Sequence, residues 1–334
     1  MAATLEAFSE VLGLFPALSD MDARQVGELY RAYSKTAAEN LAEPIDFLKY
    51  RFFELDGGAR ARYLTRRQYA DLARRVNDPA SARVLADKTQ FLAVYRPYLG
   101  RCAFAAVPQA RPSFDALIGR CSEVVLKPAD GAYGKGIEFV RTPHGAGRDA
   151  DALWERCLAE GLVVEEPIRQ HAALARVHPA SVNCVRVVTA IDGAGTVHVV
   201  SAVLRCGRGG MRTDSGGGLA AAIDLETGRA RSAAVSHLGE RFEGHPDTAV
   251  AFEGLAIPCW ELLLDGAASA ARVLPDLRLA NWDWACSAQE TWCLVEGNLD
   301  GGLGPCQEAL GRGLAADVHA ALGLDGAGGQ KEKR

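Results

Sequence analysis

The chain has 334 residues, of which 49% are hydrophobic and 24% are charged, and its formal net charge at pH 7 is −5. This length suits two or three subdomains around a sizeable core, and the composition is typical of a globular protein. The slightly acidic balance gives no electrostatic reason to expect nucleic acid or an anionic membrane as a partner. The sequence has no run of about 18 apolar residues, so it predicts no membrane span.

The beginning of the chain, "MAATLEAFSE", lacks basic residues and a long apolar stretch. We therefore expect no signal peptide and a cytoplasmic location. Cysteine usage agrees with this expectation, because there is no C-x-x-C pair and no tight Cys/His cluster, which argues for reduced thiols and against a zinc site. The sequence leaves a homodimer open. The cysteines are Cys102, Cys121, Cys157, Cys184, Cys206, Cys259, Cys286, Cys293 and Cys306.

The first hundred residues have helical patterns, including a capping signal in which Thr65 is followed by Gln68. From residue 121 strands dominate. We expect strands at "SEVVLKP", "IEFV" and "LVVEE", a long hairpin from "VNCVRVVTAID" to "TVHVVSAVLR", and a late pair, "LRLANWDWAC" and "TWCLVEGN". Few crossover helices separate these strands. The pattern favours an α+β fold with antiparallel sheet over a doubly wound parallel fold.

The late strand pair predicts two opposed carboxylates. If its turn is centred between Gln289 and Glu290, Asp283 lies directly opposite Glu296, and Asn298 lies on the same face two positions along. Two facing anions are destabilising unless a shared proton or a cation neutralises them. Oxygen ligands of this kind suit magnesium, which usually brings substrate phosphates with it. The alternatives are that Glu296 pairs with an arginine or that the register differs by one residue.

The stretch "VVLKPADGAYGKGIEFV" predicts a glycine-rich hairpin next to a lysine. Lys127 ends a buried strand, and Gly131, Gly134 and Gly136 follow it. A P-loop or dinucleotide fingerprint needs a helix after the glycines, whereas a strand follows here. Such a hairpin can lie over phosphates and present backbone N–H groups to them. The alternative is a plain surface turn.

Taken together and in this order, the motifs resemble the ATP-grasp superfamily, and most closely its branch of sugar-transfer-associated ATP-grasp proteins. The stretches that carry the resemblance are "ADKTQF", "VVLKPADGAYGKGI", "LVVEEPI", "SVNCVRVVTAIDG", "DSGGGLAAAIDLETG", "NWDWA" and "LVEGN", from about residue 85 to 322. The resemblance implies two α+β subdomains that hold ATP between antiparallel sheets. Its parts are a helical N-terminal region at 1–84, a small subdomain with the glycine hairpin at 85–166, a C-terminal subdomain with the magnesium and acceptor sites at 167–324, and a disordered tail at 325–334.

The resemblance also implies a set of nucleotide contacts. Lys88 and Lys127 contact the phosphates of ATP, loop 130–136 closes over them, and the Glu165 side chain hydrogen-bonds the adenine amino group. The main chain of the residues that follow lines the base. The full set is Lys88, Lys127, Gly134, Lys135, Gly136, Glu165, Glu166 and Ile168.

For metal and acceptor the resemblance implies that Asp283, Glu296 and Asn298 hold one or two magnesium ions. Catalytic roles fall to arginines directed at the triphosphate and acceptor, together with a lysine: Arg186, Arg205 and Lys127. Small and polar residues shape the acceptor pocket: Asn183, Ser215, Gly217 and Gly218.

Two departures from the family pattern stand out. The glutamate that binds ribose in many members is missing from "RQHAAL", where Gln170 or His171 would have to replace it. The arginine expected two residues before the metal-binding aspartate is Asn281 here, so Arg186 or Arg205 would take its role.

The resulting expectation is an ADP-forming carboxylate–amine ligase that works through an acyl phosphate on a small molecule or biosynthetic intermediate. Its catalysis is positioning and electrostatics, and the sequence presents no convincing Ser-His-Asp or Cys-His set. Two alternatives stay open. One is a phosphotransferase that acts on a sugar-like hydroxyl, and the other is a non-catalytic ATP-binding module.

Overall fold

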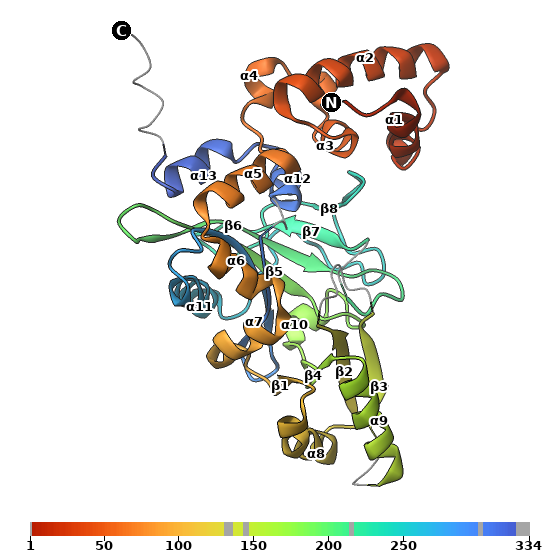
Figure 1. The fold of residues 1–334 in the computed structure, drawn as a ribbon. Helices are drawn as coiled ribbons and strands as arrows, with labels where there is room; N and C mark the ends of the chain where they lie inside the picture. Colours follow the sequence, from red (N-terminus) through yellow and green to blue (C-terminus); the bar gives the residue numbers. More distant parts are fainter. Residues whose placement is uncertain (1, 130–135, 143–146, 214–216, 300–302, 325–334) are drawn as a thin grey trace.

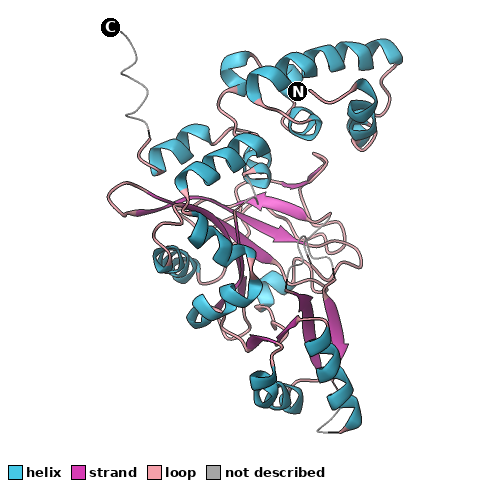
Figure 2. Cartoon of the chain, in the orientation of Figure 1, coloured by secondary structure: helices cyan, strands magenta, loops and turns pink. Residues whose placement is uncertain are grey.

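The computed structural model describes residues 2–129, 136–142, 147–213, 217–299 and 303–324. Within these ranges the chain forms a helical N-terminal region and two antiparallel sheets with helices packed on them (Figures 1 and 2). Every pair of neighbouring strands in the described sheets is antiparallel, which confirms the predicted α+β class. None of the helices in the described part of the chain has the length and apolar character that crossing a bilayer requires.

The first four helices have a core of their own. They are α1 (Leu5–Leu12), α2 (Ala23–Asn40), α3 (Pro44–Lys49) and α4 (Gly57–Arg60), with 3₁₀ turns at Pro16–Leu18 and Phe52–Glu54. Aromatic rings fill this core, and Phe8 stacks on Tyr33 with 4.9 Å between ring centroids. The α2 helix begins at a capping box formed by Asp22 and Gln25. The region sits at the end of the molecule farthest from the smaller sheet (Figure 1).

The N-terminal helices are tied to the rest of the chain through α12 (Gly304–Leu310). Gln307 of this helix is fully buried, and its amide bonds the backbone N–H and carbonyl of Leu64 and the hydroxyl of Tyr50. Beside it, Lys49 pairs with Glu308 at 2.7 Å. Buried polar groups need such partners, so this contact fixes how the N-terminal region sits on the body of the protein.

The smaller sheet has the strand order β1-β4-β2-β3. Its strands are β1 (Ala103–Ala105), β2 (Glu123–Pro128), β3 (Glu138–Arg141) and β4 (Leu162–Glu165), and the helices α8 (Arg111–Arg120) and α9 (Arg148–Ala159) pack against it. Strand side chains alternate between faces. Val124 and Leu126 of β2 therefore join the helix-covered core, while Val125 and Lys127 face a cavity on the other side.

The larger sheet has the order β11-β10-β5-β6-β7-β8-β9. Its strands are β5 (Cys184–Ile191), β6 (Val197–Cys206), β7 (Leu219–Ala222), β8 (Ala234–Ser236), β9 (Arg241–Phe242), β10 (Leu279–Cys286) and β11 (Trp292–Asn298). The short helix α10 (Ala172–Ala175) precedes β5. The predicted turn at Gly193–Gly195 does join β5 and β6.

Helices cover both faces of this sheet. On one face lie α11 (Trp260–Val273), α6 (Pro79–Ala86), α7 (Lys88–Val94) and the 3₁₀ turn Arg96–Tyr98, around Trp282 and Trp284. On the other lie α5 (Arg66–Val76), α12 and α13 (Ala315–Ala321). The predicted capping box of Thr65 and Gln68 does start α5. Residues 85–99 pack in a core cluster that contains residues of the larger sheet and also Val163 of β4, and the expected boundary at 85 stays a prediction.

Candidate active site

The two predicted carboxylates do face each other. Asp283 on β10 pairs with Glu296 on β11, and Asn281 pairs with Asn298. The predicted turn centre was wrong: the turn runs from Ser287 to Thr291, which places Trp284 opposite Leu294. A bulge at Val295 then shifts the register by one residue and brings the two acids opposite each other. The turn and the bulge together therefore produce the expected pair.

Arginine neutralises one of these acids. Arg186 on β5 lies opposite Asp283 and donates from Nε and Nη2 to the two carboxylate oxygens at 2.7 and 2.6 Å. Arg205 on β6 adds a third bond of 3.3 Å. Burial alone would raise the pKa of Asp283, but Arg186 and then Arg205 lower it to about 2. The alternative of an arginine partner thus applies to Asp283 rather than to Glu296.

The pKa of Glu296 is shifted in the opposite direction to that of Asp283. Burial and the neighbouring Asp283 charge raise its pKa, and the amide of Asn298 donates to its Oε1 at 3.1 Å. The Glu296 side chain is surrounded by protein yet exposed to the cavity that it lines. A carboxylate with a raised pKa that faces an open cavity is one that a cation would stabilise.

The donor set fits magnesium with one restriction. Glu296 offers oxygen ligands at the cavity wall, and the amide of Asn298 lies beside it, whereas both oxygens of Asp283 already accept hydrogen bonds from Arg186. Oδ2 of Asp283 accepts from both Arg186 and Arg205, whereas Oδ1 accepts from Arg186 Nε, so Oδ1 is the oxygen that Asp283 can share between the arginine and a metal. Among the described residues no cluster of three or more His, Cys, Asp or Glu side chains suited to a metal occurs, so any metal here relies on the two acids and the amide.

Both predicted phosphate lysines reach the same cavity as the acids. This cavity has a volume of about 370 Å³ and lies between the two sheets, with Lys88, Lys127, Asp283 and Glu296 on its wall. The Lys127 ammonium pairs with Glu165 at 2.9 Å, and Lys88 donates to the carbonyl of Ala129 at 3.4 Å. The fold therefore brings together charged groups that are up to about two hundred positions apart in the sequence.

The glycine-rich hairpin lies mostly outside the described residues, and this includes Gly134 and Lys135. Gly136 is described and has a φ of +74°. A Cβ atom added at this position would lie 2.8 Å from Cγ of Pro128. Both the backbone conformation and the close approach require glycine here. The prediction that the hairpin covers phosphates stays a prediction.

Two cations hold one carboxylate oxygen of Glu165, and its predicted contact with an adenine amino group stays a prediction. Its carboxylate accepts from Lys127 and from Arg101, whose Nη2 lies 2.8 Å away. Burial would raise the pKa of Glu165, but Arg101 and Lys127 lower it to about 2. Arg101 was missed in the sequence, since nothing local marks an arginine whose partner lies 64 positions away.

The segment after β4 lines the cavity with Glu166, Pro167 and Ile168. The Glu166 carboxylate pairs with Arg120 at 2.7 Å, and its N–H donates to the carbonyl of Cys102 at 2.8 Å. Because the N–H of Glu166 is already bonded, its carbonyl is the main-chain group that could accept a hydrogen bond from an adenine. Ile168 lies on the apolar part of the wall, and its predicted main-chain contact with the base stays a prediction. Other apolar lining residues are Val125, Ile137, Phe139 and Val295.

Neither proposed replacement for the ribose-binding glutamate is poised for that role. The side-chain amide of Gln170 donates to the carbonyls of Ser181 and His178 and accepts from the N–H of Asn183. His171 caps helix α10 by accepting from the N–H of Ala173 at 3.1 Å. Both side chains hold the loop before β5.

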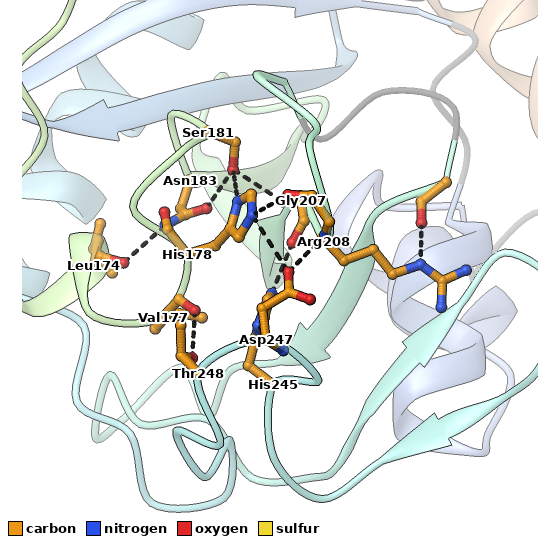
Figure 3. A network of polar contacts seen from close by, with 12 residues as sticks. Leu174, Val177, His178, Ser181, Asn183, Gly207, Arg208, His245, Asp247 and Thr248 are labelled. Atoms are coloured by element: carbon orange, nitrogen blue, oxygen red, sulfur yellow. Dashed lines mark hydrogen bonds and ion pairs between the residues drawn. The ribbon is translucent and has the colours of Figure 1, made fainter.

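Asn183 belongs to the same loop-holding network (Figure 3). Its amide donates to the carbonyls of Leu174 and His178 at 2.7 and 2.9 Å and accepts from Ser181, and the residue is completely buried. The expectation that Asn183 shapes an acceptor pocket is therefore not supported, because its side chain has no surface or hydrogen-bonding capacity to offer. The sequence missed that this asparagine is structural.

The loop after β6 approaches the cavity through residues that the sequence did not single out. Its beginning is held by His178 and His245, which bond the carbonyls of Gly209 and Gly207 at 3.1 and 2.8 Å (Figure 3). Arg212 then reaches the wall formed by the smaller sheet. Its guanidinium lies 3.6 Å from the centroid of the Phe139 ring and pairs with Glu123 at 2.9 Å.

The predicted acceptor residues of this loop are less well placed. Ser215 lies outside the described residues. Gly217 and Gly218 lead into β7 and are not among the described residues that line the cavity, and the carbonyl of Gly217 accepts from Arg208 at 2.9 Å.

Asn281 occupies the position where the family pattern has an arginine, and it is fully buried. Its Nδ2 donates to the Tyr69 hydroxyl at 3.0 Å and to the Asn298 carbonyl at 3.2 Å. Its Oδ1 has no hydrogen-bond partner among the described residues. Arg186 and Arg205 are the cations on this face of the sheet beside Asp283, so they are the residues that can take over the missing charge.

These features match a known family. Residues 67–321 match the family model described as sugar-transfer associated ATP-grasp. The chain belongs to this family. The match begins after the first four helices and covers the two sheets that form the cavity, so the ATP-grasp fold inferred from the motifs is confirmed.

Solved structures of related fold include the ATP-grasp ligase PsnB in complex with a minimal precursor, with 19% identity, a TM-score of 0.39 and coverage of 68% of this chain and 56% of that one. D-alanyl-alanine synthetase A from Vibrio cholerae O1 biovar eltor str. N16961 is 13% identical, with a TM-score of 0.42 and coverage of 70% and 60%. Biotin carboxylase from Campylobacter jejuni is 14% identical, with a TM-score of 0.44 and coverage of 77% and 51%. This chain thus spans little more than half the length of these proteins. No curated protein sequence matches it.

Proposed function

We propose that this protein is an ATP-dependent, ADP-forming ligase that joins a carboxylate to an amine through an acyl phosphate. The observation that carries the proposal is the cavity wall on which two lysines, an exposed glutamate and an arginine-paired aspartate meet. Membership of the ATP-grasp family supports it. The proposed cofactors are ATP and one or two magnesium ions, and the proposed partners are a small carboxylate and a small amine, with no nucleic acid and no membrane.

In this proposal the lysines position the triphosphate. Lys88 and Lys127 come from different elements and both line the cavity, so they can hold phosphate oxygens at fixed positions. Positioning and fixed positive charge are what in-line phosphoryl transfer requires from a protein. Lys127 would divide its ammonium between the nucleotide and Glu165, which already holds it in a defined orientation.

The metal site of the proposal uses Glu296, Asn298 and Oδ1 of Asp283. Magnesium bound there would neutralise phosphate charge. Arg186 keeps Asp283 ionised and oriented, because a bidentate guanidinium restricts the carboxylate more than a single hydrogen bond does. Arg205, next to it, is the side chain proposed to stabilise the anion that forms when an amine attacks the acyl phosphate.

A phosphotransferase is the second candidate, and Asn281 favours it. Ligases of this superfamily commonly have an arginine at that position for the tetrahedral intermediate, whereas here a buried asparagine bonds Tyr69 and the backbone. A kinase that stops after phosphoryl transfer to a hydroxyl needs no such group.

Hydroxylamine distinguishes the two candidates. Purified protein is incubated with ATP, magnesium and a pool of carboxylic acids, ADP release is followed by a coupled assay, and hydroxylamine is added. A carboxylate-dependent hydroxamate supports the ligase. A stable phosphorylated product without hydroxamate supports the kinase. Binding of ATP without ADP release from any carboxylate, amine or polyol pool would instead indicate a non-catalytic ATP-binding module.

A further inference from the structure

A second cavity, with a volume of about 480 Å³, adjoins the proposed nucleotide cavity. Glu123 and residues 166–169 line both, so the two cavities share a wall. The lysines and the two acids of the proposed active site line the first cavity and not the second. The second cavity therefore lies outside the place where phosphoryl transfer is proposed, on the side of the segment that follows β4.

Most of the charged side chains around this second cavity already have partners. Arg101 is paired with Glu165, Arg120 with Glu166, and Glu123 with Arg212. These pairs balance one another, so they contribute little net charge to the cavity.

Three further polar side chains of the wall, all of exposed residues, have no hydrogen-bond or ion-pair partner within the described ranges of the chain. They are the guanidinium of Arg169, the hydroxyl of Ser122 and the amide of Gln289. All three can donate hydrogen bonds, and Arg169 adds a full positive charge. The uncompensated part of the wall is therefore cationic and rich in donors.

Arg120, Cys121 and Arg169 all line this cavity. Burial and Glu166 raise the pKa of the Cys121 thiol, and the charges of Arg120 and Arg169 both act against that rise. The backbone of Arg169 is fixed as well, since its carbonyl accepts from the N–H of Ala288 in the β10–β11 turn at 2.7 Å. The arginine is thus anchored at its main chain beside a lined cavity.

We propose that this second cavity is a binding site for a small organic or inorganic oxyanion, a carboxylate or a phosphate, with Arg169 as its main contact. Guanidinium groups bind such oxygens in pairs, and hydroxyl and amide donors complete the shell. The volume is that of a small-molecule site. The chemistry favours an anion, because Arg169 can offer paired hydrogen bonds and a positive charge to its oxygens.

The shared wall predicts that anion binding is coupled to nucleotide binding. This coupling rests on the proposed function, in which the first cavity holds ATP. An anion on one side of residues 166–169 and a nucleotide on the other contact the same short segment. Any change that one ligand makes in the affinity of the other must be reciprocal.

The test uses the full-length protein without nucleotide, with inorganic phosphate and malonate as probes. Iodoacetamide labelling of Cys121 is followed by peptide mass spectrometry, and binding is measured by calorimetry. One or both anions are expected to slow labelling of Cys121, and Arg169→Ala is expected to weaken binding roughly tenfold or more, as loss of a charged hydrogen-bonding partner does. Arg169→Lys should retain part of the affinity.

Two controls separate the second cavity from other sites. Arg176→Ala removes an exposed arginine that lines neither cavity, so it should leave binding and protection unchanged. Lys127→Ala should also leave Cys121 protection unchanged, because that lysine lies in the first cavity. Protection by malonate alone identifies a carboxylate site, and protection by phosphate alone a phosphate site.

The proposal is overturned if neither anion protects Cys121, or if Arg169→Ala binds as the wild type does while its thermal unfolding is unchanged. It is also overturned if Lys127→Ala, rather than Arg169→Ala, removes the protection. Repeating the titration with a non-hydrolysable ATP analogue then measures the coupling. Absence of ATP binding would contradict the proposed function and leave the anion result standing.

Discussion

Arg186 and Asp283 face each other on neighbouring strands and share two hydrogen bonds of 2.7 and 2.6 Å. Both side chains are nearly inaccessible to solvent, with exposed fractions of 9% and 6%. A carboxylate in such a place is stable only because the guanidinium satisfies both of its oxygens. The pair therefore serves the fold and, in the proposed function, the metal site.

Replacing Arg186 by alanine should destabilise the protein strongly. The substitution leaves a buried carboxylate with Arg205 as its remaining arginine partner, and breaking a buried pair costs about 3–5 kcal/mol. We expect Arg186→Ala at the lower end of that range by urea unfolding, and Arg186→Lys at a smaller cost. Arg229→Ala, at an exposed turn, is the control. Wild-type stability of Arg186→Ala would show that Asp283 is not held as described.

Glu296→Gln should abolish ADP release while leaving the fold intact. The change keeps the shape and the hydrogen bond to Asn298 but removes the charge that a cation would bind. Because the glutamate has a raised pKa beside Asp283, losing its charge should not lower stability, and thermal unfolding should show an equal or higher midpoint. Glu290→Gln, an exposed position in the turn of the same hairpin, is the matched control. Normal turnover by Glu296→Gln would remove the metal assignment.

The strand pair shows both what local sequence predicts and where it stops. Alternation placed Asp283 and Glu296 on one face, because side-chain direction in a strand depends only on position. The bulge at Val295 could not be predicted, since a bulge is set by how the whole sheet pairs. Arg101 and Arg212 were missed for a similar reason. Each pairs with a glutamate on a strand that is far away in the sequence, and the residues around each arginine do not indicate that partner. Asn183 was misjudged because a polar residue before a strand looks the same whether it lines a pocket or holds a loop.

Lys127→Ala should weaken ATP binding and also reduce stability. The ammonium lies in the cavity and pairs with the buried Glu165, which would keep Arg101 as its partner. We expect roughly tenfold or more weaker binding of ATP in calorimetry, and a loss of about 1–3 kcal/mol in unfolding free energy, typical of one charged hydrogen bond.

Lys35→Ala, on the exposed side of α2, should change neither quantity. Stability lost without any change in ATP affinity would assign Lys127 to the fold alone, and would count against its phosphate role.

Asp46 in helix α3 should make the stability of the protein fall as pH rises through mildly acidic values. The residue is 4% exposed, and burial raises its pKa to about 6, against which the backbone N–H of Glu43 acts. The folded state therefore binds this proton more tightly than the unfolded state, whose carboxyl has a pKa of about 4. The stabilisation that this tighter proton binding provides is complete below pH about 4 and is lost as pH rises through about 6.

Asp46→Asn removes the ionisation and retains an oxygen that can accept from Glu43. In urea unfolding, the free-energy difference between variant and wild type should grow in favour of the variant by about 2 kcal/mol between pH 4.5 and 7.5, which is the part of a shift of roughly two pKa units that falls in this pH range. Asp115→Asn, on the surface of α8 and paired with Arg111, should show no such growth. A difference independent of pH would mean that Asp46 ionises in the folded protein as freely as in the unfolded chain.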